Sequence, residues 1–292
     1  MSLPPRPLIV RWMTRLACAA LAAIFFLALP AQAQVHSRIY PAPTAPISIT
    51  GLPAGAAIDT VKTADGLMLR GIEIAPREGR PTLLIFHGNE ASAMGSIQWF
   101  APLIAEGYGA VAAEYREYSG NPGKATEAGL AADADAFYAR ARALAGPGPL
   151  IVVGHSLGGG VAFGLATRQR LDALVTIGAF TNLRAMAPKL LRSLIEDRYD
   201  NEAAVATLDE PWYQIHGTAD DTVPWQQGEA LARAAAAGHK AGASLVIEGA
   251  GHAPDGAVLA MILRAIAAKL QGGGKAVSVT LPQIVRLVPF GP

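Results

Sequence analysis

Short apolar runs alternate with longer stretches of helical periodicity from Pro81 onward. Runs such as TLLIF and LIVVGH have the length of strands and no polar face, which is typical of strands buried on both faces of a sheet. The stretches between them are long enough to form the crossover helices that parallel strands require. This order predicts an α/β fold, a doubly wound and mostly parallel sheet with helices on both faces. The expected strands are residues 82–86, 110–115, 150–155, 173–180, 212–217 and 244–249, and the expected helices are residues 97–106, 127–144, 157–170, 226–237 and 257–270.

An antiparallel hairpin is expected at the N-terminal edge of this sheet. Two β-rich runs, AIDTVK and LMLRGIEI, flank an Asp65-Gly66 pair, and glycine allows the positive φ that a tight turn requires. Four prolines predict that residues 34–55 form an extended lead-in. The folded domain is therefore expected over residues 56–270. Residues 271–292 form a C-terminal tail whose apolar stretch is either a late strand or a packed arm.

The first 33 residues have the three parts of a secretory signal peptide. Three arginines precede an apolar run over residues 16–29, and small residues then supply a cleavage site after Ala33. The apolar run is shorter than the roughly 20 residues that span a bilayer. We therefore predict export to the periplasm or the extracellular space, with no stable membrane anchor after cleavage. The alternative is an uncleaved leader that anchors the chain in the inner membrane.

Composition argues for a well-buried core and against a polyanionic partner. Hydrophobic residues make up 51% of the chain and charged residues 16%, a balance unlike that of disordered chains. Removing the leader with its three arginines leaves 21 basic and 23 acidic side chains. We therefore expect no nucleic-acid partner. The single cysteine, Cys18, lies in the leader, so the mature chain forms no disulfide. Composition leaves the oligomeric state open.

A glycine-rich turn follows the expected strand at residues 150–155. The segment GHSLG centres on Ser156 and leads directly into a helical run. A strand, a sharp turn and a helix in this order expose a serine hydroxyl as a nucleophile, and the flanking glycines avoid steric clashes in the turn. The first N–H of the helix, that of Leu157, points at the site and suits a developing oxyanion. The rival interpretation, a phosphate-binding turn, lacks the G-x-G-x-x-G spacing and the P-loop lysine.

A serine nucleophile needs a base, and the base needs an orienting acid. Three histidines follow Ser156, and of these only His252 lies in a flexible Gly-Ala-Gly-His loop after the last clear strand. Two adjacent carboxylates, Asp220 and Asp221, follow the expected strand WYQIHG. We therefore predict His252 as general base, with either Asp220 or Asp221 as the orienting acid.

These motifs resemble the α/β-hydrolase family, in particular its small lidless branch of serine aminopeptidases and dienelactone hydrolases. The resemblance covers roughly residues 82–270 and rests on four segments. They are FHGN at residues 86–89, EYR at residues 114–116, the elbow at Ser156 and HGTADDTVP at residues 216–224.

The resemblance implies roles for individual residues. The family pattern HG-x-x-D-x-x-VP selects Asp220 over Asp221 as the acid. The turn after the first parallel strand implies that the backbone N–H of Asn89 is the second oxyanion donor, with His87 shaping the turn. Glu117 departs from the family, because similar proteins usually have glycine there.

The expected chemistry is a two-step acyl transfer on a small-molecule ester or related acyl substrate, of the carboxylesterase type. Such a reaction needs no cofactor and no metal. A peptidase or an acyltransferase with the same residues is an alternative, and so is a non-catalytic binding protein with the same fold. Residues 181–210 are too few for a full lid domain. One amphipathic helix beside the cleft is possible there, although core packing is the better interpretation of its apolar residues.

Overall fold

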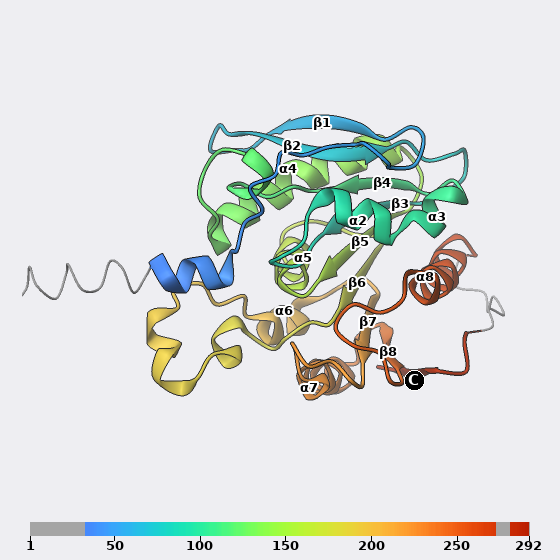
Figure 1. Cartoon of the computed structure of the whole chain (residues 1–292). Helices are drawn as coiled ribbons and strands as arrows, with labels where there is room; N and C mark the ends of the chain where they lie inside the picture. The colour runs from blue at the N-terminus through green and yellow to red at the C-terminus, as the bar shows by residue number, and fades with distance from the viewer. Residues whose placement is uncertain (1–32, 273–280, 292) are drawn as a thin grey trace, which may run out of the picture.

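The computed structural model describes residues 33–272 and 281–291. They form a nine-stranded sheet in the order β1-β2-β4-β3-β5-β6-β7-β8-β9 (Figure 1). Strands β3 to β8 are parallel, whereas β1, β2 and β9 join the sheet antiparallel. The predicted mostly parallel sheet is confirmed. The strands are β1 Ala57–Lys62, β2 Met68–Ile74, β3 Thr82–Phe86, β4 Gly109–Ala112, β5 Leu150–His155, β6 Ala173–Ile177, β7 Trp212–Gly217, β8 Gly242–Ile247 and β9 Val285–Pro289.

Helices cover both faces of the sheet, as predicted. Helices α4, α5, α6 and α7 pack together on one face, while α2, α3 and α8 contribute to the core of the other. Three short 3-10 helices, η1 to η3, lie in connecting loops. The helices are α2 Ala93–Trp99, α3 Ala101–Ala105, η1 Tyr118–Gly120, α4 Glu127–Ala145, α5 Leu157–Ala166, η2 Leu183–Met186, η3 Lys189–Leu194, α6 Asn201–Thr207, α7 Trp225–Ala237 and α8 Gly256–Gln271.

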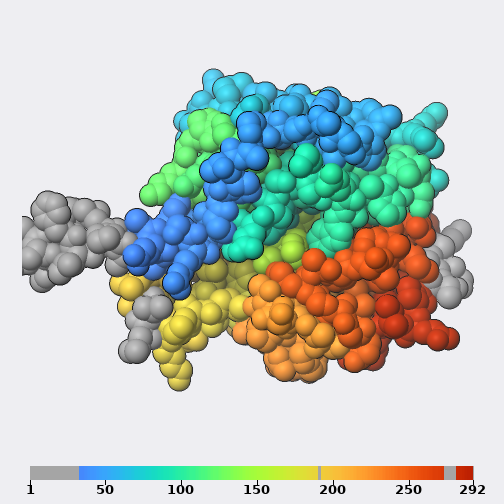
Figure 2. Space-filling model, in the orientation of Figure 1, coloured from blue at the N-terminus to red at the C-terminus, as the bar shows by residue number. Residues whose placement is uncertain are grey.

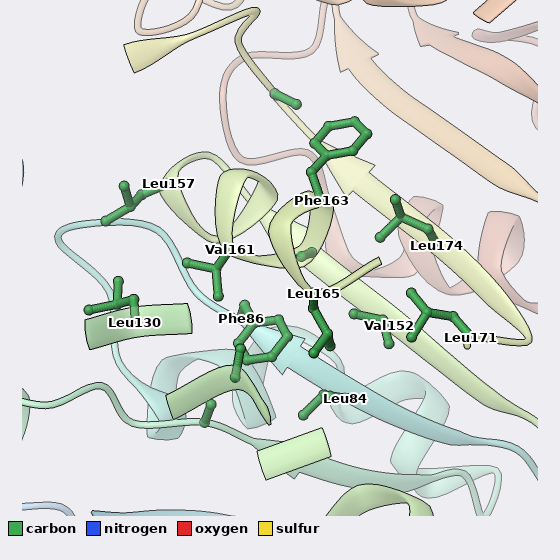
Figure 3. Packing of buried hydrophobic residues seen from close by; sticks show 14 of the residues in the cluster. Leu84, Phe86, Leu130, Val152, Leu157, Val161, Phe163, Leu165, Leu171 and Leu174 are labelled. Atoms are coloured by element: carbon green, nitrogen blue, oxygen red, sulfur yellow. The ribbon is translucent and has the colours of Figure 1, made fainter. Parts of the chain in front are cut away.

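The central strands divide their side chains between two apolar layers. In β3, Leu84 and Phe86 face the core under α4 and α5, whereas Leu83 and Ile85 face the core under α2, α3 and α8. All five residues of β3 are buried. Figure 3 shows the first layer, where Phe163 and Leu165 of α5 contact the strands. This two-sided burial explains why the central strands have no polar alternation.

The two ends of the sheet are closed by antiparallel strands. At the N-terminal edge, β1 and β2 form the predicted hairpin, and Gly66 in its turn has φ 90°. At the other edge, Val285 to Pro289 pair with β8 as strand β9. From the sequence, the C-terminal tail was expected to form either a late strand or a packed arm. In the structure it forms the strand.

The largest differences from the expected secondary structure lie in three segments, and several other elements, such as α5 and β4, end a few residues earlier than expected. Residues 33–39 are helical, although residues 34–55 were predicted to be extended, because the prolines that prevent a helix begin only at residue 41. The helix expected over residues 97–106 is two helices, and the first begins earlier because Ser92 caps it by accepting a hydrogen bond from Gly95 N–H. Residues 181–210 contain η2, η3 and α6 in place of one amphipathic helix.

The predicted leader lies outside the described residues, apart from Ala33. Within residues 33–272 and 281–291, no helix has both the length and the apolar character that crossing a bilayer requires.

Candidate active site

Ser156 occupies the sharp turn between β5 and α5. Its φ of 52° and ψ of −118° are unusual for a residue other than glycine, and such a conformation costs of the order of 1–3 kcal/mol. The fold holds it in place, since Ser156 N–H donates to Ile177 O at 2.9 Å. A Cβ on Gly154 would lie 2.3 Å from Gly158 O, and a Cβ on Gly158 would lie 2.1 Å from Phe86 O. The glycines that flank the serine are therefore a steric requirement.

The predicted oxyanion donors line the same pocket as Ser156. Within the described residues, the N–H groups of Leu157 and Asn89 have no hydrogen-bond acceptor. Leu157 begins α5, so its N–H lies at the positive end of the helix dipole. Asn89 is held by its own carbonyl, which accepts a hydrogen bond from Tyr118 Oη at 2.9 Å. Both N–H groups are thus available to a negatively charged oxygen.

His87 is buried within the turn that carries Asn89. Its Nδ1 lies 2.7 Å from Gly88 O, and its Nε2 lies 3.2 Å from Glu114 Oε1. Its ring packs against that of Tyr115 at a centroid distance of 4.2 Å. With 2% of its surface exposed, His87 contributes to the shape of the turn.

Asp220 and His252 are in direct contact. His252 Nδ1 donates to Asp220 Oδ2 at 2.8 Å. The other carboxylate oxygen, Oδ1, accepts the N–H groups of Thr222 and Val223 at 3.0 and 2.8 Å. These contacts hold the carboxylate in one orientation. Nε2 of His252 is not bonded to this carboxylate. Of the predicted site residues, the structure therefore joins Asp220 to His252.

Asp221, the rival acid, is exposed. Its only side-chain contact within the described residues is with the Thr222 hydroxyl at 3.5 Å. His216 supports Asp220 instead, with Nε2 3.2 Å from Asp220 Oδ2 and 2.9 Å from Val223 O. Both partners are acceptors, so Nε2 carries the proton. Burial lowers the pKa of His216, which favours this neutral form.

His155 is a residue that the sequence analysis did not single out. Its Nε2–H donates to the backbone carbonyl of His252 at 3.0 Å, and the two rings lie 4.7 Å apart. Trp99 packs edge-on against His155, and its Nε1–H donates to Pro254 O at 2.9 Å. The elbow and the end of α2 therefore both hold the His252 loop. Its position beside Ser156 in the motif was visible in the sequence, but the partner 97 residues later was not.

Burial lowers the pKa of His155 to about 4, and the nearby His252 acts in the same direction. Below its ordinary pKa near 6.5, the unfolded chain binds a proton at this position and the folded chain does not. The free energy of unfolding therefore falls as the pH drops from about 6.5 to about 4. We expect a loss of about 2 kcal/mol at pH 4.5 from this one residue.

Urea unfolding of the wild type and of the His155→Gln variant at pH 7.5 and 4.5 measures this loss. The variant should lose about 2 kcal/mol less than the wild type between the two pH values. Equal losses in both proteins would show that His155 is not the group responsible.

A mostly apolar cavity of about 260 Å³ lies beside Ser156. Its walls include Phe180, Met186 and Ile195 from the chain after β6. Val35, Arg38 and Ile39 from the N-terminal segment also line it. Ser156 itself is 8% exposed, and its hydroxyl has no hydrogen-bond partner among the described residues. The hydroxyl is therefore accessible to a molecule in the cavity.

In the part of the chain that the structure describes, no three His, Cys, Asp or Glu side chains form a group that could hold a metal ion.

A parallel sheet with a serine elbow, a histidine loop and an acid loop at the carboxyl ends of its strands defines a class of hydrolases. The sequence profile described as "alpha/beta hydrolase fold" matches residues 81–204. An uncharacterised protein of Mycobacterium tuberculosis is 34% identical over 216 residues, which are 71% of this chain and 75% of that protein. The chain belongs to the α/β-hydrolase family.

Three further comparisons name activities. The lysophosphatidylserine lipase ABHD12 of Danio rerio is 29% identical over 180 residues, 53% of this chain and 47% of the lipase. The solved structure of an esterase of Pyrococcus furiosus is similar with a TM-score of 0.63 at 19% identity, over 80% of this chain and 97% of the esterase. A puromycin-hydrolysing peptidase of Mycobacterium tuberculosis has a TM-score of 0.62 at 17% identity, over 79% of this chain and 41% of the peptidase. At these identities the two structures support the fold alone.

Proposed function

We propose that this protein is a serine esterase that cleaves carboxylic esters through Ser156, His252 and Asp220. The observation that carries the proposal is the 2.8 Å contact between His252 Nδ1 and Asp220 Oδ2. It lies at the same end of the sheet as a strained serine that faces an apolar cavity. The chain order serine, acid, histidine is also that of α/β-hydrolases.

In the proposed mechanism, Ser156 Oγ attacks the ester carbonyl while His252 Nε2 accepts the hydroxyl proton. Asp220 keeps the other proton of the imidazolium on Nδ1 and stabilises its charge. The N–H groups of Leu157 and Asn89 donate to the oxyanion of the tetrahedral intermediate. His252 then protonates the departing alcohol. A water molecule releases the acid from the acyl-enzyme by the same steps, and Ser156 regains its proton.

The lining of the cavity favours an ester with an apolar acyl group. Most of the lining is apolar, including Phe180, Met186 and Ile195, and Arg38 is the one charged residue among the lining residues described. A volume of about 260 Å³ lies just below the usual range of ligand pockets, roughly 300–1,000 Å³, and suits a short to medium chain. The esterase and lipase activities named for similar proteins agree with this substrate class.

Hydrolysis of p-nitrophenyl esters from acetate to palmitate tests the proposal. We expect turnover of the short and medium esters by the chain that begins at Gln34. A fluorophosphonate probe should add one covalent label, and mass spectrometry should locate it on Ser156. Hydrolysis of a peptide amide but of no ester would replace the esterase by a peptidase. Absence of both activities and of labelling would favour a binding protein.

We also propose that the protein is exported and cleaved after Ala33. The support is the arginine-rich start, the apolar run and the small residues of the leader. Expression of the full chain in a bacterium should yield a periplasmic protein whose N-terminal sequence begins at Gln34. A membrane-bound protein with an intact leader would indicate the anchored alternative.

A further inference from the structure

The N-terminal strap, residues 33–40, forms one wall of the cavity beside Ser156. Val35, Arg38 and Ile39 line this cavity although they precede the serine by more than a hundred residues. Figure 2 shows the strap in blue against the yellow segment that contains η2 and η3. The strap thus covers part of this cavity.

The strap has two helical faces, one toward the cavity and one attached to the rest of the protein. Val35, Arg38 and Ile39 are spaced i, i+3 and i+4 and share one helical face. His36 and Tyr40 are spaced i and i+4 and share another, with ring centroids 5.2 Å apart. One face can therefore contact a ligand while the other is attached to the fold.

Two sets of polar contacts attach the strap. The Tyr40 hydroxyl donates to Asp197 Oδ2 at 2.6 Å and lies 3.0 Å from the Tyr199 hydroxyl, and Tyr40 is 2% exposed. His36 Nε2 lies 2.9 Å from the carboxylate of Glu117. The contacts lie one helical turn apart, so together they define the rotation of the strap over the cavity.

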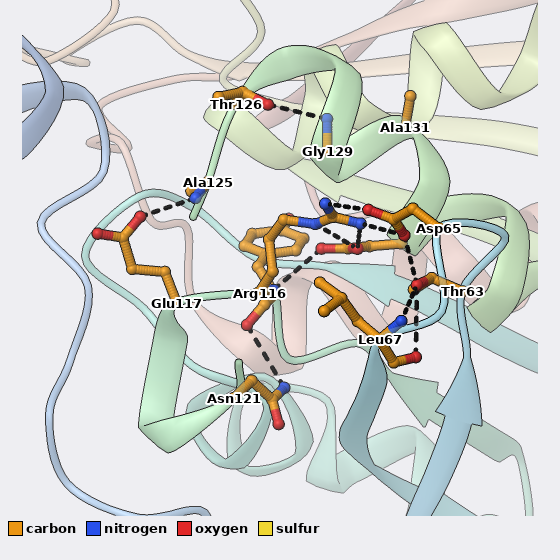
Figure 4. Close-up of polar contacts among 12 residues, drawn as sticks. Thr63, Asp65, Leu67, Arg116, Glu117, Asn121, Ala125, Thr126, Gly129 and Ala131 are labelled. Carbon is orange, nitrogen blue, oxygen red and sulfur yellow. Dashed lines mark hydrogen bonds and ion pairs between the residues drawn. The ribbon is translucent and has the colours of Figure 1, made fainter. Parts of the chain in front are cut away.

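The backbone of Glu117 has a conformation that glycine adopts at lower cost. Its φ is 73°, in the left-handed region that costs other residues roughly 1–2 kcal/mol. The carboxylate compensates for this cost with two contacts, because Oε2 also accepts the N–H of Ala125 at 2.7 Å (Figure 4). A glycine would fit the backbone better but could not reach His36.

We propose that the strap is the acyl-specificity element of this enzyme and that Glu117 positions it through His36. This inference rests on the proposed esterase function. The acyl chain of the substrate packs on Val35 and Ile39, so the strap selects esters by chain length. Glu117 touches no substrate and is a positioning residue.

The direct test removes the apolar face of the strap by the double substitution Val35→Ser and Ile39→Ser. We expect the loss in kcat/KM to grow with acyl length, to about 10-fold or more for the octanoate ester, because apolar contacts of this size discriminate by such factors. Ser37→Ala is the matched control, since Ser37 is exposed and outside the cavity. An equal loss for all esters would overturn the proposal.

The role of Glu117 is tested by comparing glycine and glutamine at this position. Glu117→Gly relieves the backbone but removes the acceptor, so we expect a higher KM for octanoate, with kcat little changed. Glu117→Gln keeps an acceptor for Ala125 N–H and His36 and should restore most of the affinity. Hydrogen exchange of residues 34–40 should be faster in the glycine variant alone. Equal exchange in both variants would contradict the positioning role.

A binding measurement separates this inference from the proposed function. Decanoate binding is measured by calorimetry in the Ser156→Ala background, where no turnover is needed. Weaker binding after the double substitution supports the proposed contact between the strap and the acyl chain even if the wild type hydrolyses no ester. Unchanged binding, together with an active wild type, overturns the proposed role of the strap and leaves the esterase proposal intact.

Discussion

Replacing Ser156 by alanine should lower kcat for p-nitrophenyl butyrate by about 10⁵-fold or more, because the acyl-enzyme can no longer form. We expect the residual rate to come from the N–H groups of Leu157 and Asn89, the proposed oxyanion donors. The fold should persist, since the hydroxyl has no hydrogen-bond partner among the described residues. Steady-state kinetics measure the loss of kcat and the residual rate. Fluorophosphonate labelling tests for the nucleophile, and the thermal unfolding midpoint tests whether the fold persists.

Ser119 provides a matched control for this substitution. It is also a buried serine at positive φ, with φ 49° and 3% exposure, but it does not line the cavity. Ser119→Ala should therefore keep the activity and the covalent label. If Ser156→Ala retained more than a hundredth of the wild-type kcat, the serine mechanism would be wrong.

Replacing Asp220 by asparagine should lower kcat by about 10³- to 10⁴-fold with a small effect on KM. The amide can still accept the N–H groups of Thr222 and Val223 through Oδ1, so the loop should keep its shape. What is lost is the carboxylate oxygen 2.8 Å from His252 Nδ1, which in the proposed mechanism sets the tautomer and stabilises the imidazolium. Circular dichroism should confirm folding, and kcat and KM at pH 7.5 should report the loss.

Asp221→Asn is the control for Asp220→Asn, because Asp221 is the adjacent carboxylate and the alternative acid that the sequence offers. Its side chain is exposed and has no contact with His252 in the described part of the chain. Asp221→Asn should change kcat by less than about 2-fold, as expected for an exposed residue away from the site. A large loss for Asp221→Asn and a small one for Asp220→Asn would reverse the assignment.

The elbow was predictable because its constraints are local. A buried strand, a turn too tight for side chains and a helix start lie within a dozen residues, so residue types alone indicate the backbone path at Ser156. The parallel sheet was predictable for a similar reason, since apolar runs of strand length imply burial on both faces. The fold prediction is confirmed, whereas the catalytic roles of Ser156, Asp220 and His252 stay predictions that the variants above test.

The local sequence does not distinguish the two adjacent carboxylates. Asp220 and Asp221 are equivalent by composition, and only the family pattern favoured the first. In the structure the turn after β7 places Asp220 against His216 and His252 and leaves Asp221 exposed. Which of two adjacent side chains faces inward depends on a loop geometry that residue types do not specify.

By itself the sequence determined the sheet, the elbow and the position of the histidine loop, because burial and tight turns restrict residue types at short range. Only the tertiary structure decided that His155 holds the His252 loop and that Glu117 attaches residues 33–40 beside the cavity. Each of these contacts joins residues 81 or more positions apart. Such pairs leave no periodicity in the chain, since they depend on how separate elements pack and on the directions in which their side chains then point.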